Sequence, residues 1–307
     1  MSGEALPFRF NFGATSAELD LSPGTGKTLK SSSDPPLSCS EISVPIQPPE
    51  KARCAFTTVA VDKSRGIHLC KGSIDNSSVP DLTDTPETAD SDLIPGKYEG
   101  GFKLWECALD LSAHLCQAFD IRATQERWSS ALPGNTRVLE LGCGHGLPGI
   151  LLLLAGCKVH FQDYNAEVLQ SLTSVNVLEN LGSHPGTAIL RDERPRYFAG
   201  DWGMLPELLD SKGVLGRGYD IILAAETIYS PDSQKQLLQC IKKCLRPGTG
   251  QAWIAAKSYY FGVGGGIASF RALVASDGMY NVSTAATFDD GASNKREVLL
   301  LTHTEAS

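Results

Sequence analysis

The chain has 307 residues, enough for one large domain or two small ones. Its formal net charge of −8 excludes a general affinity for nucleic-acid backbones, although it leaves a local basic groove open. The nine cysteines form no CxxC pair, which argues against a zinc site or a disulfide framework and favours a reducing compartment. There is no signal-like N-terminus and no 18-residue apolar run, so we expect a protein that is neither secreted by the usual signal nor membrane-spanning.

Residues 1–92 differ in composition from the rest of the chain. They are rich in Ser, Pro, Thr and Asp and carry 8 basic against 13 acidic residues. Such a composition buries too little apolar surface to offset chain entropy, so we expect a largely disordered region with one edge strand over residues 55–61. The sequence FRFNF at 8–12 is either a short docking motif or a chance pattern with transient strand character.

Order is expected to begin near Ile94, and a Gly-Gly pair at 100–101 then precedes a predicted helix. Leu104, Leu111 and Leu115 recur at helical spacing, which predicts a helix from about residue 104 to 118. The loop before this helix can lie over a cofactor. Trp105 would either line that site or pack in the core, and Glu106 could meet a cation.

Residues 138–163 predict a strand, a glycine turn, a helix and a second strand. The first strand is VLEL at 138–141, the turn is GCGHG at 142–146, and Pro148 suits the first turn of the helix. Glycines such as Gly142 and Gly144 let a ligand approach the backbone, and the helix N-terminus directs N–H groups at it. Asp163, at the end of the second strand, lies where an acid binds a ribose diol. The pattern therefore predicts a site for an adenosine-type cofactor.

Glu140 decides which cofactor we expect. A carboxylate immediately before the glycine turn disfavours the pyrophosphate of a dinucleotide and suits the cationic groups of S-adenosylmethionine (SAM). The alternative is a strand–helix turn that binds no ligand. His145, inside the turn, is expected to be a bystander.

The later elements place further polar residues at strand ends. A helix is expected from Asn165, as its cap, to about residue 180. Asp201 and Trp202 follow a strand end and suit an adenine, through its amine and by stacking. Glu226 and Tyr229 follow an apolar strand at 220–225, typical of a central parallel strand. The remaining predicted elements are a helix at 232–245, a strand at 251–257, an aromatic-glycine loop at 259–266, a helix at 267–276, and two antiparallel strands at 280–288 and 297–302.

These motifs resemble known families. LELGCG at 139–144 and QDYN at 162–165, with this order of elements, resemble the seven-strand SAM-dependent methyltransferases. More narrowly, a set of motifs together resembles the eukaryotic protein-histidine methyltransferases, which modify a histidine of a large-subunit ribosomal protein. The set is KYEGGFKLWEC at 97–107, FQDYN at 161–165, GDW at 200–202, AETIY at 225–229 and YFGVGGG at 260–266. The resemblance implies an α/β, Rossmann-like sheet that is mostly parallel with an antiparallel last strand, helices on both faces, a domain at 93–307 and a disordered N-terminal tail over 1–92.

The resemblance and the residue patterns together give a candidate cofactor site and no metal ligands. The candidate SAM-binding residues are Leu104, Trp105, Glu106, Cys107, Ala108, Glu140, Gly142, Gly144, Asp163, Tyr164, Asn165, Gly200, Asp201, Trp202 and Ala225. Ala108 and Ala225 depart from the hydroxyl residues expected in the family, although backbone contacts would survive both changes.

The expected reaction is methyl transfer to a histidine nitrogen, with Glu226 holding the ring N–H and Tyr229 orienting the ring. Expected partners are a protein substrate, with ribosomal protein as the first candidate, and no membrane or directly read nucleic acid. We expect a monomer in the cytoplasm and nucleus, with the nucleolus as a further candidate location. Three alternatives stay open: a protein methyltransferase directed at lysine or another residue, a small-molecule methyltransferase, and a non-catalytic ribosome-assembly binder.

Overall fold

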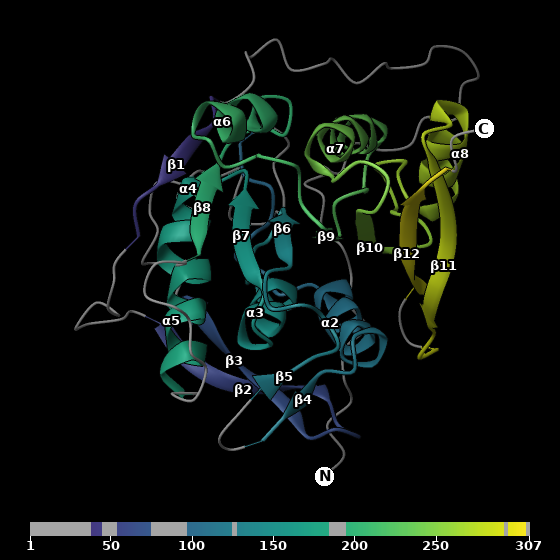
Figure 1. Ribbon diagram of the computed structural model, residues 1–307. Coiled ribbons are helices and arrows are strands. Elements are labelled where there is room, and N and C mark those ends of the chain that lie inside the picture. Colours follow the sequence, from purple (N-terminus) through teal and green to yellow (C-terminus); the bar gives the residue numbers. More distant parts are fainter. Residues whose placement is uncertain are drawn as a thin grey trace, which may run out of the picture.

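A mixed eight-stranded sheet organises the computed structural model, which describes residues 38–44, 54–74, 97–124, 128–183, 195–291 and 294–304. The strand order is β1-β8-β7-β6-β9-β10-β12-β11 (Figure 1). The strands are β1 (Ser40–Ile42), β6 (Arg137–Leu141), β7 (Lys158–Asp163), β8 (Arg196–Ala199), β9 (Ile221–Ala225), β10 (Gln251–Lys257), β11 (Tyr280–Phe288) and β12 (Arg296–His303). Seven of these are the strands of the predicted sheet, and β1 is an addition at its edge.

The five central strands, from β8 to β10, are parallel to one another. Strand β12 runs antiparallel to both β10 and β11, and β1 runs antiparallel to β8. The predicted parallel sheet with an antiparallel last strand is therefore confirmed.

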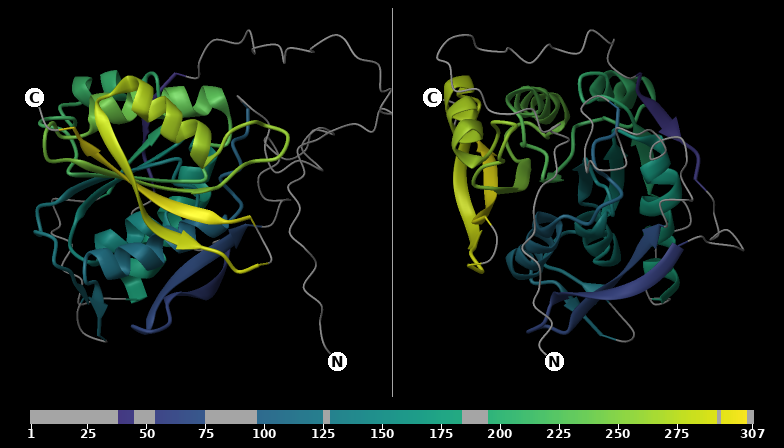
Figure 2. Two further views of the ribbon diagram at one scale, coloured as in Figure 1. Left: turned by 90° about the vertical axis from the view of Figure 1, so that its right-hand side faces the viewer. Right: turned by 180° about the vertical axis from the view of Figure 1, so that it is seen from behind.

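Helices cover both faces of the sheet (Figure 2, left). Side chains alternate along each strand, so Val138 and Leu223 pack into one apolar core, while Leu139 and Ile222 pack into the other. The first core includes residues of α2 (Glu106–Ala118), α3 (Leu147–Leu154) and α5 (Ser174–Ser183), and the second includes those of α6 (Leu205–Ser211), α7 (Pro231–Cys244) and α8 (Ile267–Asp277).

The helix after β7 contains a π-helical turn. It comprises α4 (Ala166–Val168), η2 (Leu169–Thr173) and α5. Within η2, Thr173 Oγ1 donates a hydrogen bond to the Gly144 carbonyl at 2.6 Å. The π turn thus brings a side chain of this helix into contact with the glycine turn after β6.

Part of the polar N-terminal region forms a hairpin of β2 (Cys54–Asp62) and β3 (Ile67–Ile74). The expected strand at 55–61 lies within β2, but it pairs with β3 rather than with an edge of the main sheet. Ile67 and Leu69 are fully buried in the first core, and the Asn180 amide bonds both main-chain groups of Cys70. This packing was not anticipated from composition. The motif at 8–12 and the expected start of order at 94–96 lie outside the described residues.

Two short strands, β4 (Arg122–Ala123) and β5 (Trp128–Ser129), pair after α2. Among the described residues, we find no helix both long enough and apolar enough to cross a membrane.

Candidate active site

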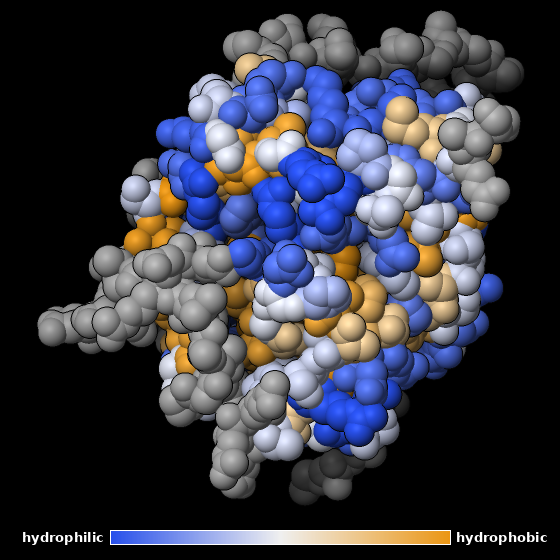
Figure 3. Space-filling model, in the orientation of Figure 1, coloured by the Kyte–Doolittle hydropathy of each residue, from blue (hydrophilic) through white to orange (hydrophobic). Residues whose placement is uncertain are grey.

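The carboxyl ends of β6, β7, β8, β9 and β10 meet at one edge of the sheet, where α/β proteins bind ligands. In register, Leu141 lies beside Gln162 and Ala224, and Asp163 lies beside Ala199. The predicted polar residues that follow these strands are therefore close in space. Strongly hydrophilic residues gather on the surface above the ends of β6 and β7 (Figure 3).

The glycine turn after β6 is as tight as predicted. Gly142, Gly144 and Gly146 have φ angles of 61°, 48° and 71°, in the left-handed region that favours glycine. A Cβ on Gly142 would lie 2.9 Å from Thr227 Cγ2, and one on Gly144 would lie 3.0 Å from the Gly101 carbonyl oxygen. Neighbouring segments thus approach this backbone too closely for any larger residue.

The loop at 97–105 lies against the glycine turn, since the Gly101 carbonyl approaches Gly144 closely; that it covers a cofactor stays a prediction. The Asn165 side chain holds it, because Oδ1 accepts the Glu99 N–H at 3.2 Å and Nδ2 donates to the Lys97 carbonyl at 2.9 Å. Asn165 occupies the N-cap position of α4, yet its side chain makes no cap hydrogen bond. The predicted capping role is therefore wrong, because the amide binds the loop. Trp105 Nε1 donates to the Gly100 carbonyl at 3.0 Å, which folds the loop back on itself.

Gln162 joins the glycine turn to the predicted adenine segment, and sequence analysis did not single it out. Its Oε1 accepts Trp202 Nε1–H at 2.7 Å and the Gly142 N–H at 3.2 Å, while Nε2 donates to the Gly200 carbonyl at 2.8 Å. The side chain is 0% exposed. Its place one residue before Asp163 at a strand end was the available signal, but a polar residue facing inward cannot be distinguished there from one facing solvent.

Asp163 and Glu140 are both buried beneath the turn. Asp163 accepts hydrogen bonds from the main-chain N–H groups of Gly144 and Asn165, at 2.9 and 3.1 Å, and burial raises its pKa to about 6. Glu140 accepts the Gly149 N–H at 2.8 Å, and burial raises its pKa to about 8. The Glu140 carboxylate is therefore directed at the start of α3 and is 2% exposed, rather than presented to a ligand as we had expected.

The candidate catalytic residues, Glu226 and Tyr229, both bind other protein groups. Glu226 follows β9 with a left-handed φ of 57°, and its Oε2 accepts a hydrogen bond from the Tyr260 hydroxyl. The Tyr229 hydroxyl donates to Glu99 of the loop over the turn. Burial and the Glu99 charge raise the pKa of Tyr229 well above its usual range. Tyr229 thus bridges the end of β9 and the loop, and neutral phenol is its form at physiological pH.

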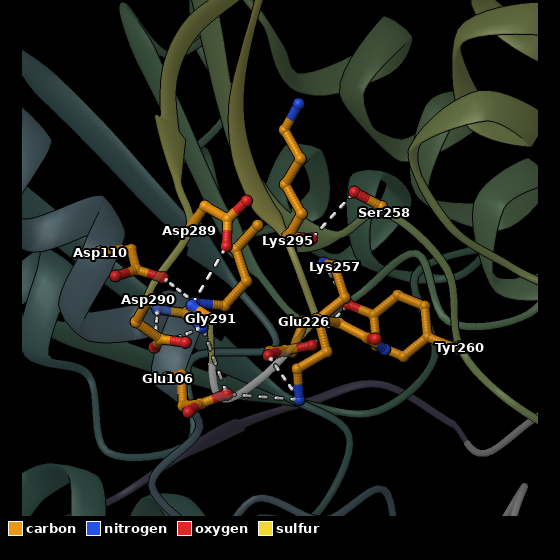
Figure 4. A network of polar contacts seen from close by, with 12 residues as sticks. Glu106, Asp110, Glu226, Lys257, Ser258, Tyr260, Asp289, Asp290, Gly291 and Lys295 are labelled. Carbon is orange, nitrogen blue, oxygen red and sulfur yellow. Dashed lines mark hydrogen bonds and ion pairs between the residues drawn. The ribbon is translucent and has the colours of Figure 1, made fainter.

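A buried network of charges surrounds Glu226 (Figure 4). Lys257 Nζ lies 3.5 Å from Glu226 Oε1 and 3.7 Å from Glu106 Oε2. Arg296 lies 3.8 Å from Glu106 through Nη1 and 2.6 Å from Asp110 through Nε. Glu106, expected to meet a cation, therefore faces two cations of the protein itself. Lys257 and Arg296 were not predicted, because isolated basic residues at strand ends resemble ordinary surface residues.

The other candidate residues differ in how far they are exposed to solvent. Cys107 is fully buried, and burial with the nearby Glu226 raises its pKa well above the usual range. Asp201 Oδ1 accepts the Gly203 N–H at 2.7 Å. The half-buried candidates are Leu104, Trp105, Glu106, Ala108, Tyr164, Asp201, Trp202 and Ala225.

Thr227 supports the view that this edge holds a polar ligand. Its methyl group packs over Gly142, yet its buried Oγ1 has no hydrogen-bond partner among the residues that the structure describes. A buried hydroxyl is rarely left without a partner in the absence of a ligand or water. This hydroxyl lies beside the glycine turn, where a Cβ on Gly142 would also lie 3.5 Å from Trp202 Cζ2, so the residues present fit an adenosine-type ligand.

Curated relatives of the chain include histidine protein methyltransferases. A "Histidine protein methyltransferase 1 homolog" from Dictyostelium discoideum is 42% identical over 69% of this chain and 61% of its own length, and one from Bos taurus is 38% identical over 66% and 55%. A "Protein N-terminal and lysine N-methyltransferase" from Cryptococcus neoformans is 29% identical over 50% and 46%. The aligned part of this chain spans about three-fifths or less of each of these proteins.

Solved structures that resemble the chain include a TehB-like SAM-dependent methyltransferase from Corynebacterium glutamicum. It is 17% identical and covers 57% of this chain and 83% of its own, with a TM-score of 0.39. The fibrillarin/Nop5p complex is 14% identical over 70% and 88%, with a TM-score of 0.43. The protein-family profile described as lysine methyltransferase matches residues 96–259, which contain the glycine turn, the loop over it and the end of β9. Because this profile covers more than half of the chain, the protein belongs to that methyltransferase family.

Proposed function

We propose that the protein is a SAM-dependent methyltransferase that methylates a histidine side-chain nitrogen, with a large-subunit ribosomal protein as its substrate. The observation that carries this proposal is the glycine turn after β6, packed under the loop at 97–105. Beside it lies the buried Thr227 hydroxyl, which has no partner within the described part of the chain. Family membership assigns methyl transfer to such a turn, and the relatives named as histidine methyltransferases favour histidine as acceptor.

The residues that would hold SAM are those that converge at this edge. Gly142 and Gly144 hold the turn in its left-handed conformation, Trp202 offers a ring for adenine, and Thr227 offers a hydroxyl. When bound, SAM supplies an electrophilic methyl carbon: an imidazole nitrogen forms the new N–C bond as the C–S bond breaks and its electron pair stays on sulfur.

A histidine acceptor needs little activation. With a pKa near 6.5, imidazole is mostly neutral at cytosolic pH and one ring nitrogen has a free lone pair. The enzyme must place that nitrogen and provide an acceptor for the N–H of the other nitrogen. The same acceptor would take up the proton that the methylated, cationic ring loses. Glu226 is our candidate for this task. Its Oε2 accepts from Tyr260, whereas its Oε1 lies 3.5 Å from Lys257 Nζ and makes no hydrogen bond with the described residues. Tyr229 would orient the ring from the same segment.

The test is transfer of labelled methyl from SAM to ribosomal proteins from an unmodified source, with the modified residue read by mass spectrometry. We expect label on one histidine. Glu226→Gln and Tyr229→Phe should each slow transfer at least tenfold, because they alter the group that holds or orients the ring. If both variants stay within twofold of wild type, their catalytic roles are withdrawn.

Methylation of lysine is the second candidate function. It is favoured by the description of the family profile and by the relative named as a lysine methyltransferase. A lysine amine must first lose a proton, since its usual pKa is near 10.4. Label on a lysine in the same experiment would therefore identify this function and reject the first.

We further propose that the protein acts as a monomer in the cytoplasm and nucleus, which sedimentation and imaging of a tagged chain would test.

A further inference from the structure

Lys257, the last residue of β10, is one of the most deeply buried large side chains of the described residues. Its side chain is 2% exposed. A buried ammonium is costly unless carboxylates and hydrogen bonds compensate it, and such groups cluster at functional sites. The position of Lys257, at the same sheet edge as the glycine turn, suggests a functional reason for this burial.

The end of β10 holds Glu226 from several directions. Lys257 Nζ lies 3.5 Å from Oε1, while Tyr260, three residues later, donates its hydroxyl to Oε2. The Glu226 N–H also donates to the Ala255 carbonyl at 2.9 Å. These contacts fix a residue whose left-handed backbone is unfavourable in isolation, and with it the segment that leads to Tyr229.

Lys257 also reaches the loop that covers the glycine turn. Its Nζ lies 3.7 Å from Glu106 Oε2 and 5.7 Å from the centre of the Trp105 ring. Glu106 begins α2, and Trp105 ends the loop. One ammonium therefore links the two segments on which the proposed cofactor and acceptor residues lie, as the contacts in Figure 4 show for the two carboxylates.

We propose that Lys257 is a positioning residue for methyl transfer: its charge holds the Glu226–Tyr229 segment and the start of α2 in one arrangement. Arg296 faces the same Glu106 carboxylate at 3.8 Å, but its closer partner is Asp110 at 2.6 Å, whereas Lys257 pairs with both Glu106 and Glu226. The catalytic part of this inference rests on the proposed function.

The experiment compares Lys257→Met, which keeps an unbranched side chain one atom shorter and removes the charge, with Lys242→Met. Lys242 on α7 is also paired, with Asp277 at 2.6 Å, and makes a matched control away from the site. We expect Lys257→Met to lower kcat for histidine methylation at least tenfold and to leave KM for SAM within twofold, whereas Lys242→Met keeps both. Hydrogen exchange should quicken at the Glu226 amide and in residues 98–106 only in Lys257→Met. Lys257→Arg, which keeps the charge, should retain the wild-type exchange pattern.

Chemical rescue separates charge from packing. In Lys257→Ala, added propylammonium should restore activity at least fivefold, and propan-1-ol should not. Equal rescue by both compounds, or a Lys257→Met variant with wild-type kcat and exchange, would overturn the proposal. If wild type methylates no histidine, the proposed function fails, yet the exchange comparison still decides whether Lys257 holds the two segments.

Discussion

Gln162 joins the glycine turn to the segment at 200–202 through three side-chain hydrogen bonds. We predict that Gln162→Met weakens SAM binding at least tenfold and destabilises the fold by about 2–4 kcal/mol, because it leaves buried donors and a buried carbonyl unpaired. Asn180→Leu is the matched control, since its fully buried amide also makes three bonds, to Cys70 and Asn176. It should lose comparable stability and keep SAM affinity. Urea unfolding and calorimetry measure the two effects, and equal SAM affinity in both variants would contradict the proposed role of Gln162.

Glu140 predicts a pH dependence of stability. Burial raises its pKa from 4.5 to about 8 in the folded protein, so the folded state binds the proton more tightly than the unfolded chain. Its contribution to stability is therefore complete below pH 4.5 and is lost as pH rises through 8, by at most about 1.4 kcal/mol per pH unit. The free energy of unfolding, measured by urea at pH 5.5, 7 and 8.5, should fall less steeply in Glu140→Gln than in wild type. Glu207→Gln, at an exposed site on α6, should keep the wild-type slope.

The same residue shows a limit of reasoning from spacing. Sequence alone places Glu140 beside the glycine turn and Asp163 at the next strand end, and the structure agrees with both positions. The sequence cannot say in which direction a side chain points. Glu140 turns toward α3 and Glu226 turns toward Lys257, because each finds a buried partner there.

At the scale of elements, the parallel strands were predictable and the N-terminal strands were not. Strand β9 is a continuous apolar run, which identifies a strand buried on both faces. By contrast, β1 has three residues and β3 carries polar residues such as Lys71 and Ser73 among its buried ones. These strands form through tertiary contacts, β1 with β8 and β3 with α5, which local composition does not encode.

Strand β1 should stabilise the proposed adenine side of the site. It pairs with β8, its Glu41 forms a bidentate ion pair with Arg196, and Cys39 Sγ donates to the Asp201 carbonyl at 3.1 Å. A Cβ on Gly200 would lie only 2.7 Å from Cys39 Cα. We predict that deleting residues 1–44 weakens SAM binding about fivefold and lowers Tm by several degrees, because Asp201 and Trp202 lose this support.

Deleting residues 1–37 is the control for that experiment, since it removes the preceding chain and leaves β1 in place. It should change neither SAM affinity nor Tm. Calorimetry and a thermal scan on both deletions provide the comparison. Equal SAM affinity in the two would mean that β1 has no part in the site.

At the scale of the whole molecule, the net charge of −8 bears on the choice of substrate. An acidic enzyme attracts a basic protein over several ångströms, and salt screens this attraction, with a Debye length of about 10 Å at 0.1 M and shorter at higher ionic strength. If the substrate is a basic ribosomal protein, raising NaCl from about 50 to about 300 mM should raise its KM at least threefold and leave kcat within twofold. Methyl transfer itself moves a positive charge from the sulfonium to the methylated ring within the site, so kcat should be nearly insensitive to salt. A short neutral peptide around the same histidine is the control, and its KM should not respond. A salt-independent KM for the full protein would place recognition in local contacts at the site, such as those of the loop at 97–105, rather than in the overall charge.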